Sequence, residues 1–379
     1  MKRSSLPFGL PSSRRKFIAQ ASRAGAAFAA TRFMGVPGIA KTFAADSRVA
    51  ETPIADKGFA AVRKIGNGVY ATISDRTKGQ QTRSNGGIII GRDGAILIEG
   101  FQTPEGASFQ LDALRLVSKV PVHAAIDSHF HFDHTLGNSF YGAQGIPIWA
   151  HAKVAQRISE TYPRMQAEDL ATFLAPWKKR VQEAKTPKQR EHFESDIEGL
   201  TGMFEPVSKS VLALPSHPLD PARLPLTVDL GGQSVVIEAH VGHTDTDLIV
   251  RVPEQNIVFT GDLLVNAQYP TNLNGVFPQW RDTLAKFAAY DKQTLFVPGH
   301  GQPCGLEGVA QLRSIFDDIA AQAEKNYKAG VPVEEAVERY VVPEKLKNFR
   351  MFSWGFTVGR TTQQLYANWQ GKPGHPLTY

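Results

Sequence analysis

The sequence predicts an α/β fold in which sheets are covered by helices. Short apolar runs bounded by polar and glycine residues come in groups, and Val69–Ile73, Gly87–Ile90 and Ala95–Ile98 form the first group. Longer amphipathic segments separate the groups, beginning with residues 107–119. Strands in groups with helices between them favour sheets with helices packed outside. About 330 residues lie beyond position 45, enough for one large domain with a buried core.

The predicted elements follow in order along the chain. Arg92-Asp93-Gly94 is typical of a hairpin between the second and third strands. The helix at 107–119 leads into a strand at 122–126. Three further strands are predicted downstream, at residues 234–238, 256–260 and 294–297.

Two regions are predicted to be mainly helical. Residues 152–210 form an insertion with helices at 154–161, 165–175 and 188–202, and we expect it to border the site and influence substrate choice. A C-terminal extension at 306–379 contains a helix at 309–329, which ends near Gly330, and a second helix that starts within 331–335. The predicted catalytic domain is 46–305, and the extension is expected to pack on its core.

Metal-binding side chains are densest in His129-Phe130-His131-Phe132-Asp133-His134. In an extended segment side chains alternate, so His129 and His131 are expected on one side and the two phenylalanines in the core. A mononuclear zinc site needs only three or four protein ligands. This hexapeptide already offers four candidates, which indicates two adjacent ions.

Three more candidate ligands follow apolar runs, each beside a glycine. They are His243 after Gly242, Asp262 after Gly261 and His300 after Gly299. Glycine permits tight turns and close approach of the backbone to a ligand. The repeated order of strand, glycine and ligand favours a dinuclear metal site over a chance group of polar loop residues.

Together these residues resemble the metallo-β-lactamase superfamily of metallohydrolases, over roughly residues 58–303. The resemblance implies an αβ/βα sandwich of two mixed sheets with outer helices. It implies that one metal ion is bound by His129, His131 and His243. The other would be bound by Asp133, His134 and His300, with the carboxylate of Asp262 bridging the two. Such ligands suit zinc, with iron or manganese as alternatives.

The match also bears on the subclass. Asp262, in Thr-Gly-Asp, is similar to the bridging residue of type II glyoxalases and lactonases rather than to true β-lactamases. The early strand of the family normally ends in an aspartate, but here it ends in Glu99. We expect Glu99 to take over the orienting role of that aspartate, although its side chain is longer.

Residues 1–45 resemble a twin-arginine export signal. Ser13-Arg14-Arg15-Lys16-Phe17-Ile18 precedes an alanine-rich stretch, and Thr42–Ala45 is a plausible cleavage region. Arg23 and Arg32 interrupt the stretch, whereas a membrane span needs roughly 20 apolar residues. The prediction is therefore a periplasmic protein that engages the twin-arginine translocase during export and has no stable membrane span.

Charge and cysteine content limit the classes of binding partner and the disulfides that the sequence allows. The formal net charge is +6, but eight of the 42 basic residues and none of the 36 acidic residues precede Asp46, leaving −2 for the remainder. The chain beyond the leader therefore gives no indication of a nucleic-acid partner. The single cysteine, Cys304, excludes an intramolecular disulfide and is expected to be a packing residue.

The leading functional prediction is an exported dinuclear zinc hydrolase. A metal-bridging hydroxide would attack an ester, thioester, lactone or similar carbonyl of a small-molecule substrate. Asp133 is the predicted catalytic residue, which orients the hydroxide or passes its proton to the leaving group. The alternatives are a β-lactamase, a hydrolase of small phosphoesters, and a non-catalytic metal-binding partner of a periplasmic redox system.

Overall fold

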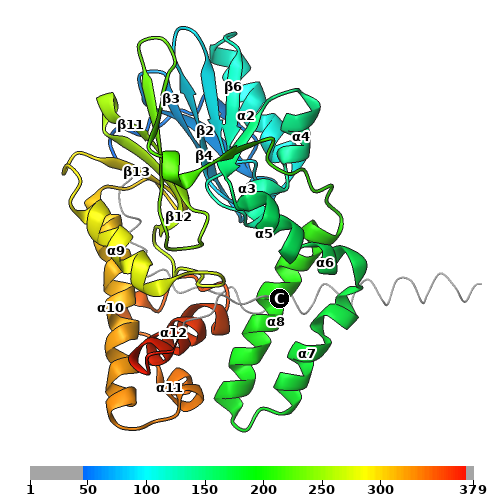
Figure 1. Cartoon of the computed structure of the whole chain (residues 1–379), viewed down its shortest axis with the longest axis vertical. Helices are drawn as coiled ribbons and strands as arrows, with labels where there is room; N and C mark the ends of the chain where they lie inside the picture. Colours follow the sequence, from blue (N-terminus) through cyan, green and yellow to red (C-terminus); the bar gives the residue numbers. More distant parts are fainter. Residues whose placement is uncertain (1–45, 373–379) are drawn as a thin grey trace, which may run out of the picture. The chain divides into compact units, whose positions relative to one another are not determined.

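The computed structural model describes residues 46–372. The predicted export signal at 1–45 lies outside the described residues. Figure 1 shows the arrangement of helices and strands. No helix within 46–372 combines the length and the apolar character that a bilayer span requires.

The first sheet has eight strands in the described part of the chain, and they follow one another in sequence order. They are β1 (Ala55–Asp56), β2 (Ala60–Gly66), β3 (Val69–Ser74), β4 (Gly86–Ile90), β5 (Ala95–Ile98), β6 (Val122–Ile126), β7 (Ile148–His151) and β8 (His217–Leu219). Neighbours pair antiparallel as far as β5 and parallel from β5 to β8. The predicted hairpin between β4 and β5 is present.

The second sheet has five strands among the described residues, in the order β13-β12-β11-β10-β9. They are β9 (Leu226–Asp229), β10 (Ser234–Ala239), β11 (Leu248–Val252), β12 (Ile257–Val265) and β13 (Leu295–His300). All neighbours are antiparallel except β12 and β13, which run parallel. Both sheets are therefore mixed.

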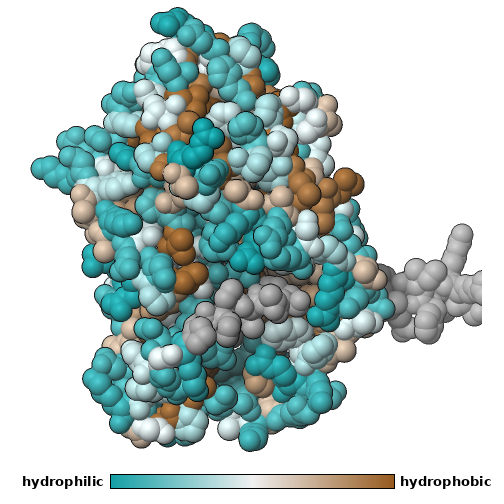
Figure 2. All heavy atoms as spheres, viewed as in Figure 1, coloured by the Kyte–Doolittle hydropathy of each residue, from teal (hydrophilic) through white to brown (hydrophobic). Residues whose placement is uncertain are grey.

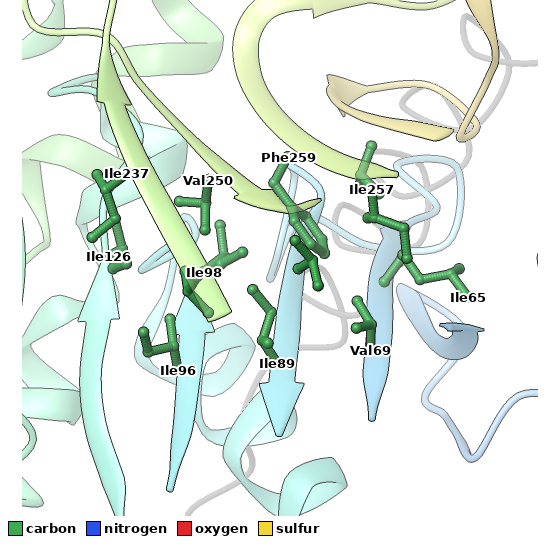
Figure 3. Close-up of a cluster of buried hydrophobic side chains, with 14 of the residues drawn as sticks. Ile65, Val69, Ile89, Ile96, Ile98, Ile126, Ile237, Val250, Ile257 and Phe259 are labelled. Carbon is green, nitrogen blue, oxygen red and sulfur yellow. The ribbon is translucent and has the colours of Figure 1, made fainter. Parts of the chain in front are cut away.

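The main hydrophobic core lies between the two sheets. Figure 3 shows Ile89 and Ile98 of the first sheet facing Val250 and Phe259 of the second. All four side chains are buried. These positions alternate along their strands with residues that point to the outer layers, as the period of two requires.

Helices cover the outer face of each sheet. On the first sheet these are α2 (Pro104–Val117) and α4 (Asn138–Ala143), whose Phe109 and Tyr141 are buried against it. On the second sheet they are α9 (Phe277–Ala288) and α10 (Leu306–Lys328), and α12 (Arg360–Trp369) packs against α10. The predicted α/β sandwich of two mixed sheets with outer helices is confirmed.

Residues 152–210 contain four helices: α5 (Val154–Thr161), α6 (Pro163–Ala167), α7 (Leu170–Gln182) and α8 (Pro187–Ser208). The single helix expected at 165–175 is wrong. The chain is instead broken between α6 and α7, because Asp169 adopts an extended conformation and its side chain caps α7 by accepting from the amide of Thr172. Helices α7 and α8 lie side by side (Figure 1).

The remaining short elements are α3 (Phe132–Thr135), α11 (Val333–Arg339), the 3₁₀ turns η1 (Pro221–Arg223), η2 (Pro253–Gln255) and η3 (Glu344–Leu346), and the π-helical turn η4 (Gly355–Gly359). On the face shown in Figure 2, hydrophilic residues predominate and hydrophobic ones form small separate groups. Scattered apolar residues of this kind are usual on protein surfaces.

Candidate metal centre

The seven predicted ligands come from five segments and meet at one edge of the sandwich. His129 and His131 follow β6, Asp133 and His134 lie in α3, His243 lies between β10 and β11, Asp262 lies in β12, and His300 ends β13. All seven side chains are buried. The structure therefore brings together every residue that the sequence singled out for this site.

Two glycines allow β12 to approach its neighbours closely. Gly261 has a φ of +51°, and a Cβ there would overlap the side chain of Ser128, which follows β6. A Cβ on Gly299 would overlap Oδ1 of Asp262. The register between β12 and β13 also shifts on either side of Gly261. The missing side chain at Gly299 thus makes room for Asp262 beside β13, and the one at Gly261 makes room for Ser128.

The first group of ligand atoms consists of three imidazole nitrogens. Nδ1 of His131 lies 3.1 Å from Nε2 of His129 and 2.8 Å from Nε2 of His243. Nε2 of His131 lies 2.9 Å from the amide oxygen of Asn274, which can only accept, so Nε2 carries the proton and Nδ1 presents a lone pair to the group.

The protonation states of the three histidines in this group favour binding of a metal cation. Burial lowers the pKa of His243 to about 3, and burial together with the neighbouring imidazoles holds the pKa of His129 well below its usual value. Burial also lowers the pKa of His131. All three rings are therefore neutral at physiological pH, as metal ligands must be.

The second group consists of Asp133, His134 and His300, whose candidate ligand atoms all lie within 4.8 Å of one another. Oδ2 of Asp133 is 3.4 Å from Nε2 of His300. On the far side of each ring, Nδ1 of His134 faces Oε2 of Glu99 at 3.2 Å, and Nδ1 of His300 faces the carbonyl oxygen of Arg83 at 3.2 Å. Both rings therefore direct Nε2 into the group.

Asp262 lies between the two groups. Its Oδ2 is 3.4 Å from Nε2 of His243 and 3.3 Å from Nε2 of His300, while its Oδ1 is 3.4 Å from Nε2 of His134. Burial alone would raise the pKa of Asp262, but His300 and His134 outweigh it and hold that pKa well below its usual value. Its carboxylate is thus placed to bridge.

Buried polar atoms without hydrogen-bond partners support the interpretation of these groups as metal ligands. Within 46–372, Oδ1 of Asp262 and Nε2 of His134 are buried without a hydrogen-bond partner. Leaving such groups unsatisfied costs roughly 1–3 kcal/mol each. Divalent ions coordinated by these atoms would remove that cost, and the imidazole and carboxylate donors are those zinc prefers.

Sequence reasoning anticipated Glu99 but missed other supporting residues. The carboxylate of Glu99 lies 3.2 Å from Nδ1 of His134, and the backbone of Glu99 has a φ of +75°. Asn274 and the carbonyl of Arg83, which fix His131 and His300, gave no signal because neither is near a ligand in the sequence. Phe130 and Phe132 are buried in a hydrophobic core cluster, as expected. Phe132 also lines the cavity, because the chain turns into α3 there.

A cavity open to solvent lies over the candidate metal centre. Its floor includes His131, Asp133, His243, Asp262 and His300. Its apolar wall is formed by Phe132, Met203, Tyr269, Leu273 and Phe352, and its cationic wall by Arg76, Arg83 and Arg350. Met203 comes from α8 and Phe352 from the segment after α11, so both helical regions help to enclose the site.

Comparison with solved structures shows similarity of fold. A metallo-beta-lactamase from Pontibacter korlensis is 20% identical, with 67% of this chain and 97% of that chain covered and a TM-score of 0.47. The stereoselective inverting sec-alkylsulfatase Pisa1 from Pseudomonas sp. is 16% identical, with 83% of this chain covered and a TM-score of 0.56. This chain spans about half of the alkylsulfatase, 51% of its length.

A comparison with curated protein sequences gave no match. The model of the metallo-beta-lactamase superfamily matches residues 80–300. This range includes all seven candidate ligands and more than half of the chain. Members of the superfamily typically bind metal ions, and the convergent histidine and aspartate groups agree with that property. The chain belongs to the metallo-beta-lactamase superfamily.

Proposed function

We propose that this protein is a dinuclear metal-dependent hydrolase of a small ester, thioester, lactone or similar carbonyl compound. The observation that carries the proposal is the position of Asp262 within 3.4 Å of imidazole nitrogens from both ligand groups. A carboxylate so placed can hold two ions side by side, beneath a cavity that admits a substrate.

In this proposal His129, His131 and His243 would hold one zinc ion, Asp133, His134 and His300 would hold the other, and the Asp262 carboxylate would be shared by both. Zinc ions supply, when bound, a nucleophile at neutral pH and polarisation of the substrate carbonyl. Iron or manganese would accept the same nitrogen and oxygen donors, so metal analysis decides the native pair.

Asp133 is the proposed catalytic residue. Burial raises its pKa, but His134, His300 and Arg83 outweigh burial and the net shift is downward. Asp133 is thus a carboxylate at neutral pH. Its backbone oxygen accepts a 2.6 Å hydrogen bond from Ser84, which fixes its orientation. It can accept a proton at the floor of the cavity and release it to the leaving group.

The walls of the cavity would orient the substrate. Phe132, Leu273 and Phe352 form an apolar side of the cavity, and Met203 of α8 places the insertion at its wall. We propose on this basis that residues 152–210 influence substrate choice. Exchanging Met203 for alanine should change relative rates across a series of acyl groups, and unchanged relative rates would contradict that role.

The experiment that tests the function is metal analysis followed by a substrate panel. The purified chain, assayed with its metals, should hydrolyse activated esters, thioesters or lactones and lose that activity after chelation. Faster hydrolysis of a chromogenic β-lactam or a phosphodiester would favour one of those activities instead. Two bound ions without turnover on any member of the panel would favour a non-catalytic metal-binding role.

We also propose that the chain is exported to the periplasm by the twin-arginine route. The support is Ser13-Arg14-Arg15-Lys16-Phe17-Ile18 followed by an alanine-rich stretch without acidic residues. That route carries folded proteins, so the metal site could be filled before export.

A further inference from the structure

We propose that the substrate carries an oxyanion group, such as a carboxylate, sulfate or phosphate, and that Arg76, Arg83 and Arg350 bind it. The inference rests on the proposed hydrolytic function, and it narrows the substrate class. It follows from three guanidinium groups that line one cavity with too few acidic partners.

Arg83 is the most deeply placed of the three, with 6% of its surface exposed. Its Nε lies 3.6 Å from Oδ2 of Asp133, and its guanidinium lies over the ring of Phe132 at 4.9 Å. Its remaining polar contacts are long, the shortest being 3.3 Å from Nη1 to the amide oxygen of Gln102. Arg83 is therefore held in the wall of the cavity with donors that are poorly satisfied.

Arg76 and Arg350 have no ion pair within the described part of the chain. Nε of Arg76 is buried without a hydrogen-bond partner. Burial, and then the positive charges of Arg83 and Arg350, lower the pKa of Arg76 to about 9. Arg76 is still a cation at neutral pH, but its charge is held against the repulsion of its two neighbours.

The balance of charge becomes more positive once the proposed ions are counted. The carboxylates that act on the three arginines are Asp133, Asp262 and Glu198. The first two would be metal ligands, so their charge would be offset by the ions. Only Glu198, which acts on Arg350, would remain for three guanidinium groups. Arg83 is buried and Arg76 is half-buried, whereas Arg350 is exposed. Buried charge without a partner is costly, and an anion bound at Arg83 and Arg76 would remove that cost.

The chemistry of guanidinium selects the partner. Its planar fork of donors matches two oxygens of a carboxylate, sulfate or phosphate, and bonds of this type are stronger than those between neutral groups. A neutral ester would add no anionic partner for any of the three guanidinium groups. The arrangement thus favours a substrate in which the anionic group lies next to the bond that is broken.

A groove next to the cavity also indicates where the rest of the substrate would lie. Arg83, Arg350 and Phe352 line both the cavity and a neighbouring groove. The other side of that groove is formed by α8, including Glu198 and Thr201. An anionic group bound at the arginines would lie where cavity and groove meet, with the reacting bond over Asp133 and Asp262 and any longer portion along α8.

The test uses the full chain with its metals and two esters that share a leaving group. p-Nitrophenyl acetate is neutral, and mono-p-nitrophenyl succinate adds a carboxylate. The wild type should prefer the succinate in kcat/KM by roughly tenfold or more, as expected for charge-assisted hydrogen bonds. Arg76→Gln and Arg350→Gln should each reduce that preference several-fold, mainly through KM. Arg92→Gln is the matched control, because Arg92 is exposed on the β4–β5 hairpin.

Inhibition of ester hydrolysis by acetate, methyl sulfate and methyl phosphate then distinguishes the kind of oxyanion. The preferred kind is the one that inhibits the wild type most strongly and loses that inhibition in the arginine variants. A wild type without preference for the anionic ester, or a preference that both variants retain, would overturn the inference while leaving hydrolysis intact.

If no ester is turned over, calorimetry with monomethyl succinate separates the two proposals. Binding that Arg76→Gln weakens supports the anion site although the proposed function fails, and binding unaffected by both variants overturns it.

Discussion

The carbonyl oxygen of Arg83 lies 3.2 Å from Nδ1 of His300, two residues separated by more than half of the chain. A carbonyl can only accept, so the contact fixes the proton on Nδ1 and leaves Nε2 free to face Asp133 and Asp262. Arg83 has a φ of +59°, which is uncommon for a residue other than glycine. The adjoining Asn85 donates 2.8 Å to the carbonyl of Pro298 and so ties the same two segments together.

The carboxylate behind His134 should control affinity for the second ion. Burial lowers the pKa of His134, but Glu99 and Asp262 outweigh burial and raise it well above its usual value. Glu99→Gln keeps the size of the side chain but removes its charge. We expect affinity for one ion to fall about 10- to 100-fold, the usual effect of losing such a partner.

Competition with a chromogenic chelator measures that affinity. Glu105→Gln, an exposed position in the first turn of α2, is the control and should bind metal as the wild type does. Equal affinities for the Glu99 variant and the wild type would show that Glu99 does not support the site.

The absence of a side chain at position 299 should be essential for the position of Asp262. A Cβ there would overlap Oδ1 of Asp262 and approach the backbone of Gly261 at 2.8 Å. Gly299→Ala is therefore expected to lower the free energy of unfolding by about 1–3 kcal/mol, the range for overpacking a buried site. It should also displace Asp262 and weaken metal binding.

Denaturant unfolding and metal analysis of the same preparation provide the measurement. Gly142→Ala is the matched control: an added Cβ meets nothing within 4 Å, and the position is helical. Alanine there should leave stability unchanged or raise it slightly. Wild-type stability and metal content in the Gly299 variant would contradict the packing argument.

A buried histidine away from the metal centre should make stability depend on pH. The ring of His192 in α8 stacks on Trp354 with centroids 4.0 Å apart, and burial, with a smaller effect of Lys188, lowers its pKa to about 4. The unfolded value is near 6.5. The neutral form is favoured by the fold, so this contribution is complete above pH 6.5 and is lost as pH falls toward 4.

Thermal unfolding at pH 7 and pH 4.5 tests this expectation. His192→Gln removes the titration, so its loss of Tm between the two pH values should be smaller than that of the wild type. An identical loss in the two proteins would show that His192 does not contribute to the acid sensitivity.

Much of the site was predictable because its ligands follow apolar runs that form strands. An apolar run, a glycine and a ligand recur at His243, Asp262 and His300, and neighbouring strands deliver such residues to one edge, although β12 continues past Asp262 to Val265. Glu99 was predictable for the same reason, since it directly follows β5.

The remaining features depend on contacts that no local pattern encodes. Arg76 and Arg350 are far apart in the sequence, and only the packing of the last segments beside α8 places them in one cavity. Asn274 lies in a loop, where no periodicity marks it. The break between α6 and α7 was missed because a single capping residue, Asp169, outweighs the helical pattern around it.

The export proposal has its own test. Replacing Arg14 and Arg15 together by lysine should retain the precursor in the cytoplasm, because the twin arginines are the feature that the translocase reads. Fractionation followed by immunoblotting gives the result, with Lys2→Arg, outside the motif, as the control. A normal periplasmic yield of the double variant would refute the twin-arginine route.

Metal stoichiometry of the wild type and Asp262→Ala tests most directly whether two ions are held across Asp262. Asp317→Ala, an exposed position in α10, serves as the control. About two ions are expected per wild-type and control chain. Asp262→Ala should lose at least one ion, and its kcat/KM should fall by at least about 100-fold, because a ligand shared by both centres is gone. Full metal occupancy and full activity in Asp262→Ala would contradict the bridging role of Asp262.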